Sequence, residues 1–544
     1  MCIHMQNSIK MNSRQGYKQY FLKGLAKIGL ANPALSAYDT LNRSRNVRTL
    51  CDVSQDIRDM YSPMDQCNGT VLIFIATTNP VIEFILASAL SIRNYNPVLL
   101  TNLGSLPRDP EVRYYWDEEA RLVLKKFNIR KFQREFGIQV LSIKSILDGI
   151  HDIPAVSEVE LKKSYHYRGI DISPYALAST RKYLQRYRLD PSEAEHNRIY
   201  TDFLQGGVMI ARAIEEVTHD QDVIAGISLE GAYVHGGILV EMLNLENVPG
   251  YIMGNGRLQN HIDFGLGSDG WIGVNFDPGE VVNFVREFEL TNVDQILLSN
   301  NLPQTAGEAG RYAKFSPEGG RGLPQSDRFT VGVFSHLLWD AATAPTAGLF
   351  TDFFNWLDCT IETLGDDTEV DVYLKAHPAE AKRGTDEFLF DYIDDYYGNL
   401  PRNIEFIPPD SHIDFYLMIP ELDAGVVYAS TVGAELVYNN IPIIIGGYPP
   451  YINYGIGYEP SSKQEFIDLL ERLPELVVTP EMHKRTERFL YHQFVNKQIH
   501  VPDITTLTGD NVDVTIELLT HDSINLIIDS IVSGKTIMRQ NLNM

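Results

Sequence analysis

A continuous apolar run opens the first regular part of this chain. Residues 71–76 read VLIFIA, without the polar and apolar alternation of a strand that has one face in water. Such a run is typical of a strand buried on both faces of a parallel sheet. A helical stretch over residues 79–95 and a second apolar run, PVLLTN, follow it. The sequence therefore predicts a βαβ unit that opens a doubly wound α/β domain.

The segment from about 108 to 218 has a helical pattern instead. Apolar residues recur at helical spacing in EEARLVLKKFNIRKFQREFG, SPYALASTRKYLQRYRL and AEHNRIYTDFLQGGVMIARAIEEVTH. Strand, turn and helix signals return at DVIAGISLEGAYVHGG. We therefore predict an N-terminal extension over residues 1–70 and a Rossmann-like domain over residues 71–305 that contains a helical insertion.

A second α/β series follows a stretch rich in glycine and proline. Residues 301–328 carry that stretch and predict a linker. The apolar runs FTVGVFSH, EVDVYLKAHP, IEFIPP, AGVVYAS and IPIIIGG then alternate with helical stretches. They predict a second Rossmann-like domain over residues 328–505. The C-terminal helices of residues 506–544 are candidates to pack back on the first domain. Two such domains place a ligand cleft outside the carboxyl ends of their strands.

Length and charge exclude several classes of protein. A chain of 544 residues exceeds one compact core. Its net charge of −25 argues against a nucleic-acid partner, because few cations are available to neutralise phosphates. No run approaches the roughly 18 apolar residues that span a bilayer, and the N-terminus lacks the apolar core of a secretory signal. We expect a cytoplasmic protein, with peripheral contact at the inner face of a membrane left open. So acidic a surface also suits concentrated salt, and a halophilic source is a hypothesis.

Neither a metal nor a cofactor is expected. The four cysteines, Cys2, Cys51, Cys67 and Cys359, are scattered and form no CxxC pair. The chain contains no GxxxxGK[ST], and its GLGSDG at residues 265–270 does not directly open a helical stretch, so an ATPase or a dinucleotide enzyme is not indicated. The acidic pair Asp220 and Asp222 precedes its strand, whereas ligands bind beyond the carboxyl end.

The first motif is VYLKAHPAE. His377 comes directly after a predicted strand, where its imidazole can donate a hydrogen bond to a phosphate. Pro378 stiffens the turn and begins the next helix. A histidine with a purely structural role in the turn is the alternative.

The second motif, VYASTVGAELVYNN, joins a predicted strand to a predicted helix. Ser430, Thr431 and Gly433 occupy the turn, and hydroxyl and backbone N–H groups at the start of a helix can bind anionic oxygens. Glu435 lies in the first helical turn, where its carboxylate can accept both hydroxyls of a ribose. The alternative is an ordinary N-cap with Glu435 complementing the helix dipole.

Two further motifs follow strands that face the predicted cleft. VGVFSHLLWDAA places Ser335 and His336 after the first strand of the second domain, with Asp340 as a helix cap. GISLEGAYVHGG places Glu230 and His235 on the opposite wall, where either could be the general base toward an acceptor hydroxyl. A glycine-rich turn with a solvated glutamate explains GISLEGAYVHGG equally well.

Residues 328–460 together resemble the capsule polysaccharide biosynthesis family, which includes bacterial Kdo transferases. The resemblance lies in the order and spacing of SHLLWDAA, FNWLDCTIETL, LKAHPAE and YASTVGAELVYNNIPIIIGGYPPYINYG. It implies a two-domain GT-B glycosyltransferase fold. It also implies that His377, Pro378, Ser430 and Thr431 contact the donor phosphate and that Glu435 contacts the ribose. In the related sialyltransferases an acidic residue before a glycine is the base, which corresponds to Glu230.

Three functions remain open on the sequence. The first is a metal-independent glycosyltransferase that moves a sugar from a nucleotide-sugar donor to a surface glycan or a lipid-linked acceptor. The second is a sugar-nucleotide 2-epimerase of the same architecture. The third is a non-catalytic subunit of a glycan assembly complex.

Overall fold

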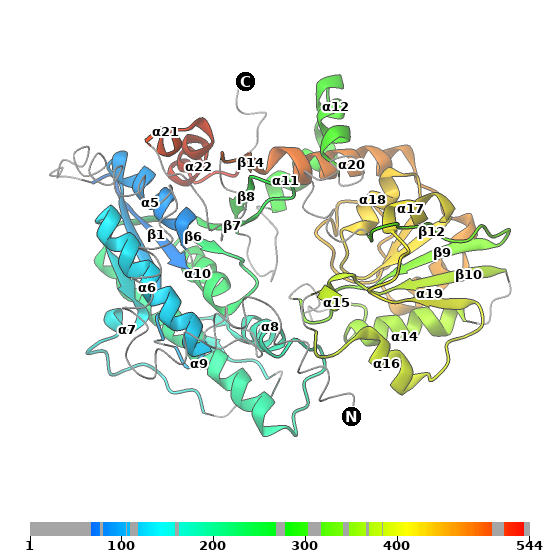
Figure 1. Cartoon of the computed structure of the whole chain (residues 1–544), viewed down its shortest axis with the longest axis horizontal. Helices are drawn as coiled ribbons and strands as arrows, with labels where there is room; N and C mark the ends of the chain where they lie inside the picture. The colour runs from blue at the N-terminus through cyan, green and yellow to red at the C-terminus, as the bar shows by residue number, and fades with distance from the viewer. Residues whose placement is uncertain are drawn as a thin grey trace.

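The computed structural model describes two lobes, each built around one β-sheet (Figure 1). It describes residues 67–537, apart from gaps at 77–79, 105, 109–117, 158–160, 162, 268–277, 303–316, 341–347, 366–368, 383–384 and 503–515. The predicted N-terminal extension up to residue 66 and the middle of the predicted linker lie outside the described residues.

The first lobe holds a seven-stranded sheet in the order β14-β8-β7-β6-β1-β2-β3. Its strands are β1 (Thr70–Ile75), β2 (Asn96–Thr101), β3 (Val140–Ser142), β6 (Val223–Leu229), β7 (Gly250–Asn255), β8 (His261–Leu266) and β14 (Gln498–His500). Five of these strands are parallel, and β8 and β14 add an antiparallel edge. The strand order changes direction between β1 and β6, which makes that point a topological switch.

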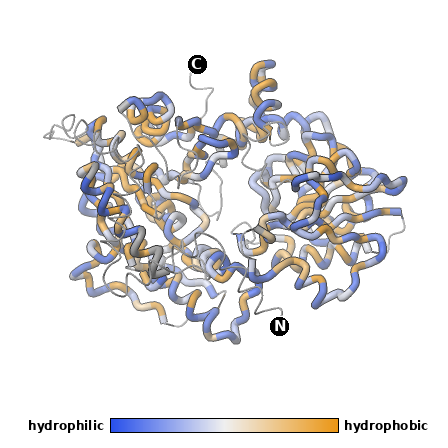
Figure 2. The backbone as a smooth tube through the Cα atoms, in the orientation of Figure 1, coloured by the Kyte–Doolittle hydropathy of each residue, from blue (hydrophilic) through white to orange (hydrophobic). Residues whose placement is uncertain are grey.

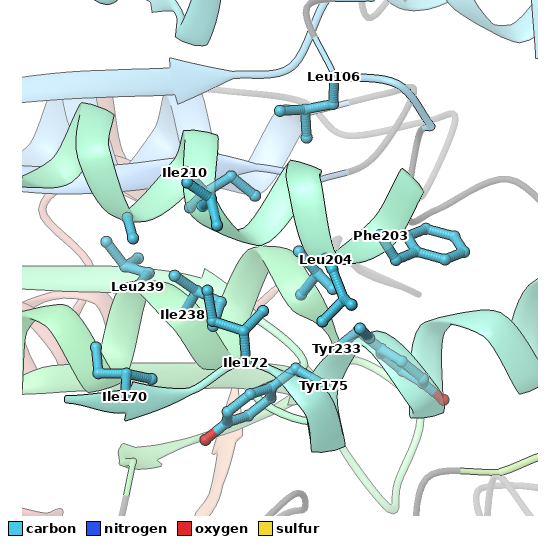
Figure 3. Close-up of a cluster of buried hydrophobic side chains, with 14 of the residues drawn as sticks. Leu106, Ile170, Ile172, Tyr175, Phe203, Leu204, Ile210, Tyr233, Ile238 and Leu239 are labelled. Carbon is cyan, nitrogen blue, oxygen red and sulfur yellow. The ribbon is translucent and has the colours of Figure 1, made fainter. Parts of the chain in front are cut away.

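Helices cover both faces of this first sheet. One face carries α5 (Val81–Ile92), α6 (Glu118–Phe136), α21 (Ile516–Leu519) and α22 (Asp522–Ser533), and the other carries α7 (Ile143–Ile146), α8 (Ser173–Leu184), α9 (Ala194–Asp220) and α10 (Val234–Leu245). The apolar run of β1 contributes to the cores on both faces of the sheet. Val71 and Ile73 pack in the core under α5 and α22, and Leu72 and Phe74 pack in the second core, under α8, α9 and α10. Figure 3 shows the second core, where α8, α9 and α10 interlock. A short hairpin, β4 (His166–Tyr167) and β5 (Ile170–Asp171), precedes α8.

The second lobe holds a five-stranded parallel sheet in the order β11-β10-β9-β12-β13. Its strands are β9 (Phe329–Phe334), β10 (Val370–Lys375), β11 (Ile404–Ile407), β12 (Ala424–Val427) and β13 (Ile443–Ile445). One face packs on α14 (Phe353–Leu364), α16 (Leu389–Tyr396), α19 (Lys463–Glu471) and η6 (Leu473–Glu475). The other packs on α11 (Pro278–Glu287), α12 (Asn292–Asn301), α17 (Phe415–Met418), η5 (Ile419–Glu421), α18 (Val432–Tyr438) and α20 (Pro480–Tyr491).

The chain crosses between the lobes at positions that correct two predicted boundaries. The helices α11 and α12 belong by sequence to the predicted first domain, yet their apolar side chains enter the core of the second. On the return, α20 continues into η7 (His492–Asn496) and then into β14, which pairs with β8 of the first sheet. The return therefore begins before residue 505. The predicted boundaries were wrong because the sequence of a short helix or strand does not indicate which lobe it will pack against.

A second contact ties the lobes together on the side of α8. Tyr187 follows α8, yet it is buried in the core of the second lobe. Its ring packs edge-on against Phe354 at 5.3 Å between ring centres, and its hydroxyl accepts a hydrogen bond from the Phe353 N–H at 3.1 Å. Glu387 of the second lobe accepts hydrogen bonds from the backbone N–H groups of Tyr187 and Arg188, both at 2.8 Å.

The predicted fold class is confirmed: two doubly wound α/β domains in a GT-B-like arrangement, with helices inserted in the first. Apolar stretches gather inside each lobe (Figure 2), as the strand runs predicted. The inserted segment is not purely helical, because β3 lies within it and extends the first sheet beside β2. Within the described part of the chain, no helix combines the length and the apolar character that crossing a membrane requires.

Candidate ligand-binding site

A pocket lies at the carboxyl ends of β9, β10 and β12. Chain order and strand order diverge here, because β9 lies between β10 and β12 in the sheet. Such switch points are where ligands bind in open α/β sheets. Six of the ten predicted site residues line this pocket: Ser335, His377, Pro378, Ser430, Thr431 and Glu435. The two motifs that follow β10 and β12 therefore meet in one pocket.

His377 is half-buried and held in a defined orientation. β10 ends at Lys375, and the chain then turns through His377 and Pro378 into α15 (Ala379–Lys382). The Nδ1 atom of His377 accepts a hydrogen bond from the Ala379 N–H at 3.1 Å. In the neutral ring this assigns the proton to Nε2. The turn thus prepares His377 to donate a hydrogen bond to an anionic oxygen.

Hydroxyl groups from two strand ends complete this side of the pocket. Ser335 follows β9, and its buried hydroxyl has no hydrogen-bond partner among the described residues. Buried polar groups are nearly always paired, so a lone one that lines a pocket suggests a ligand atom. Ser430 and Thr431 follow β12 and also line the pocket. The carbonyl oxygen of Ser430 accepts a hydrogen bond from the Tyr451 hydroxyl at 2.8 Å, which fixes the turn.

Glu435 also lines the pocket and is nine-tenths buried. It lies on α18, and the Tyr416 hydroxyl donates a hydrogen bond to its carboxylate. Burial raises the pKa of Glu435 to about 7, although the Tyr416 hydrogen bond and the charge of Arg257 lower it. A carboxyl group with this pKa titrates near neutral pH and can accept hydroxyl hydrogen bonds when ionised.

Two cations of the pocket were missed in the sequence. Lys375 is the last residue of β10, and its buried ammonium donates a hydrogen bond to the Ile413 carbonyl at 2.9 Å. Burial lowers its pKa to about 8, and Asp414 opposes this shift. A lysine that ends a buried strand, just before His377, was a visible signal. Arg257 comes from the turn between β7 and β8 of the first lobe, and nothing in its sequence context links it to this pocket.

The pocket is therefore built for an anion beside a polyhydroxylated group. Lys375, Arg257 and His377 supply positive charge or hydrogen-bond donors, and the hydroxyls lie among them. Glu435 provides an acceptor for paired hydroxyls. A phosphate joined to a ribose combines both requirements.

Two predicted donor-binding residues do not line this pocket. His336 packs next to the site, with its ring centre 6.1 Å from that of His377, and its Nδ1 lies 3.2 Å from the Leu337 carbonyl oxygen. Gly433 is buried on α18, where an added Cβ would lie 2.1 Å from the Tyr451 hydroxyl. Close packing against Tyr451 therefore accounts for the glycine, and its contact with a ligand stays a prediction.

Glu230 lies on the first-lobe side that faces the second lobe. It follows β6 with a positive φ of 56°, an uncommon backbone conformation for a glutamate. Its carboxylate pairs with the Lys182 ammonium at 2.9 Å, and half of its side chain stays exposed. The same ammonium lies 3.7 Å from the centre of the Tyr233 ring, and the Tyr233 hydroxyl donates a 3.3 Å hydrogen bond to Asp340 of the second lobe. Glu230 is thus accessible beside an inter-lobe contact.

His235 corrects the other prediction for a base. It lies in the first turn of α10 but is fully buried, with its Nε2 3.1 Å from the Leu229 carbonyl oxygen and its ring near Phe74. The interpretation of His235 as a residue that faces the acceptor is wrong. The close packing of α10 on the Glu230 turn fixes which side of the helix faces the core, and His235 lies on that side. An added Cβ at Gly236 would lie 2.2 Å from the Glu230 carbonyl oxygen.

Metal-binding side chains do not gather among the described residues. No group of three or more histidine, cysteine, aspartate or glutamate side chains in the described ranges could hold an ion. The pocket is instead lined by the side chains of Lys375, Arg257 and His377, which can carry positive charge.

Comparisons with known proteins give only remote similarity. No family model and no curated protein matches the chain. Among solved structures, the Thermosulfurimonas dismutans KpsC beta Kdo 2,4 transferase is similar at 12% identity and a TM-score of 0.30, over 49% of this chain and 79% of that one. Sucrose-phosphate synthase from Thermosynechococcus elongatus has 12% identity and a TM-score of 0.30, over 78% and 95%. UDP-GlcNAc 2-epimerase from Neisseria meningitidis has 9% identity and a TM-score of 0.25, over 85% and 99%. Similarity this low assigns no function.

Proposed function

We propose that the chain is a glycosyltransferase that takes a sugar from a nucleotide-sugar donor and passes it to a surface glycan or a lipid-linked acceptor. One observation supports this most directly. The pocket at the strand ends of the second lobe combines Lys375, His377 and Ser430 with the buried carboxyl group of Glu435. These groups suit the phosphate and the ribose of a nucleotide, respectively.

In this proposal the second lobe stabilises the leaving phosphate. His377 Nε2 donates a hydrogen bond to a phosphate oxygen, and the Ser335 and Ser430 hydroxyls add further donors. Lys375 offsets the negative charge that develops as the bond between the sugar and the donor phosphate breaks. Glu435 holds the ribose and so fixes the position of the donor sugar.

The first lobe supplies the acceptor side. Glu230 is exposed and next to Lys182, and it removes the proton of the attacking acceptor hydroxyl as the new bond forms. Lys182 orients the carboxylate. No metal takes part in this scheme, because the side chains of the pocket meet the phosphate charge.

A thermal-shift screen tests the donor site. CMP, CDP, UDP, GDP and their sugars are added to the purified chain, and a nucleotide bound by the pocket raises the melting temperature by mass action. Stabilisation by one nucleotide family supports the proposal. No stabilisation by any of them contradicts it.

An assay for released nucleotide then separates the three functions. A glycosyltransferase releases free nucleotide when its acceptor is present. A sugar-nucleotide 2-epimerase converts the sugar and releases none, and a non-catalytic subunit binds the nucleotide without turnover. Either of the last two results replaces the transferase proposal.

A further inference from the structure

One charged residue of the pocket comes from the other lobe. Arg257 lies on the β7–β8 turn of the first sheet and lines the pocket with Lys375 and Glu435 of the second lobe. Its backbone N–H donates a hydrogen bond to the Gln498 side-chain oxygen at 2.6 Å. Gln498 belongs to β14, the strand by which the chain returns to the first lobe. The turn that carries Arg257 is therefore fixed at the junction of the two lobes.

Arg257 lies near two carboxylates that differ in their other partners. It interacts electrostatically with both Asp263 and Glu435. Asp263 is buried against the Lys497 ammonium, 3.1 Å away, and so has a cation of its own. For Glu435, the positive charge that acts against the cost of burial is that of Arg257. Glu435 therefore depends on Arg257 more than Asp263 does.

Other titratable groups surround Glu435, and none repeats the role of Arg257. Tyr416 of α17 donates a hydrogen bond to it, and the Tyr451 hydroxyl is directed to the Ser430 carbonyl. Lys375, His377 and Asp414 line the same pocket. His483 and Glu487 of α20 lie near Tyr438, the last residue of α18. The neighbouring strands β12 and β13 contain no titratable side chain.

We infer that Arg257 is a positioning residue, which keeps the Glu435 carboxylate ionised and aimed at the ribose hydroxyls, so that nucleotide binding by the second lobe requires a side chain of the first. This inference rests on the proposed function, in which Glu435 holds the ribose. The inference means that the pocket is complete only when the two lobes hold the relative position seen in this structure.

The pH dependence of nucleotide affinity tests this role. The pKa of Glu435 is about 7, and only its ionised form accepts both ribose hydroxyls, so wild-type affinity should rise with pH through about 7. Removing an opposite charge shifts a neighbouring pKa by roughly 1 unit or more. We expect R257Q to move this midpoint upward by about 1 pH unit. Affinity for the nucleotide found in the screen should fall about fivefold at pH 7 and return near the wild-type value at pH 9.

Two variants control for charge and shape. R257K keeps the positive charge and should retain most of the wild-type profile. R472Q removes an exposed arginine that pairs with Glu475 in η6, and it should leave the midpoint unchanged. A loss of affinity in R257Q that is equal at every pH would overturn the inference, because Arg257 would then contact the nucleotide itself.

A second measurement needs no nucleotide and separates this inference from the proposed function. Burial holds the folded-state pKa of Glu435 above its unfolded value of 4.5, so Glu435 costs stability increasingly as pH rises from about 4.5 to about 7, and the cost is constant above that range. The gain in melting temperature from E435Q should therefore level off near pH 7. In the R257Q background it should continue to grow to about pH 8 or beyond.

The outcomes of this second measurement are distinct. A displaced plateau supports the role of Arg257 even if no nucleotide binds, in which case the proposed function fails alone. The same plateau in both backgrounds overturns the inference, even if the nucleotide screen succeeds.

Discussion

The two sides that meet between the lobes are built very differently. On the second lobe, three strand ends and the residues after them enclose a pocket, and its key groups, Ser335, Lys375 and Glu435, are nine-tenths or more buried. On the first lobe, Glu230 stands half exposed with one partner, Lys182. A buried site fixes its ligand in one geometry, whereas an open one leaves room for a large acceptor. The difference suits an enzyme that holds a small donor tightly and a bulky glycan loosely.

The largest effect is expected from a change on the open, first-lobe side. Glu230→Gln should lower turnover by roughly 10²–10⁴, the usual contribution of a general base. Nucleotide affinity should stay unchanged, because the pocket lies on the other side. Steady-state kinetics and nucleotide titration measure the two effects separately. Glu246→Gln, an exposed carboxylate at the end of α10, is the matched control.

His235 gives the contrast for that experiment. Because the ring is buried beside Phe74, His235→Ala should lower the melting temperature while the folded fraction keeps its turnover. Near-normal turnover in Glu230→Gln would show that the base lies elsewhere.

The second expected effect tests whether the two sides are held together. Tyr187→Ala removes an aromatic ring from the core of the second lobe. A truncation of this kind costs roughly 3–5 kcal/mol, measured as lower resistance to denaturant. Tyr187→Phe keeps the ring and removes the hydroxyl, which accepts a hydrogen bond from the Phe353 N–H and also pairs with Arg181. A single hydrogen bond is worth about 1 kcal/mol, so this variant should lose less stability than the alanine variant. Equal stability of the alanine variant and the wild type would argue that this contact does not join the lobes.

A smaller effect is expected on the enclosed side. His377→Ala and Glu435→Ala should each weaken nucleotide binding about tenfold or more, since one hydrogen bond to a charged group contributes roughly 1.5–3 kcal/mol. Isothermal titration measures the affinity, and circular dichroism checks the fold. The exposed neighbour Asp410→Ala controls for substitution near the pocket. Normal binding by both site variants would rule out the pocket as the nucleotide site.

The smallest expected effect is none. Treatment with EDTA should leave turnover unchanged, because Lys375 and His377 meet the phosphate charge in the proposed scheme. Loss of turnover on chelation, restored by added magnesium or manganese, would show that the enclosed side needs an ion as well.

Much of the fold was readable in the sequence. The run at residues 71–76 predicted a strand buried on both faces, and β1 is such a strand. The motifs around His377 and Ser430 were predicted to follow strands, and they follow β10 and β12. These predictions depend on local chemistry: apolar runs must be buried, and turns follow where they end. Because strand ends of one parallel sheet meet at one edge, the predicted convergence of the two motifs also follows from local signals.

What the tertiary structure alone decided is where side chains point and which lobe short segments join. His235 and Glu230 lie five residues apart in one motif, yet packing of α10 turns the histidine inward and leaves the glutamate exposed. Arg257 lines one pocket with Glu435 although 178 residues of sequence separate them, and β14 joins the first sheet after the chain has built the second. Hydrophobic periodicity determines which segments are buried, but it contains no information about partners distant in sequence. Those partners are selected by complementary packing of whole domains, which no local pattern records.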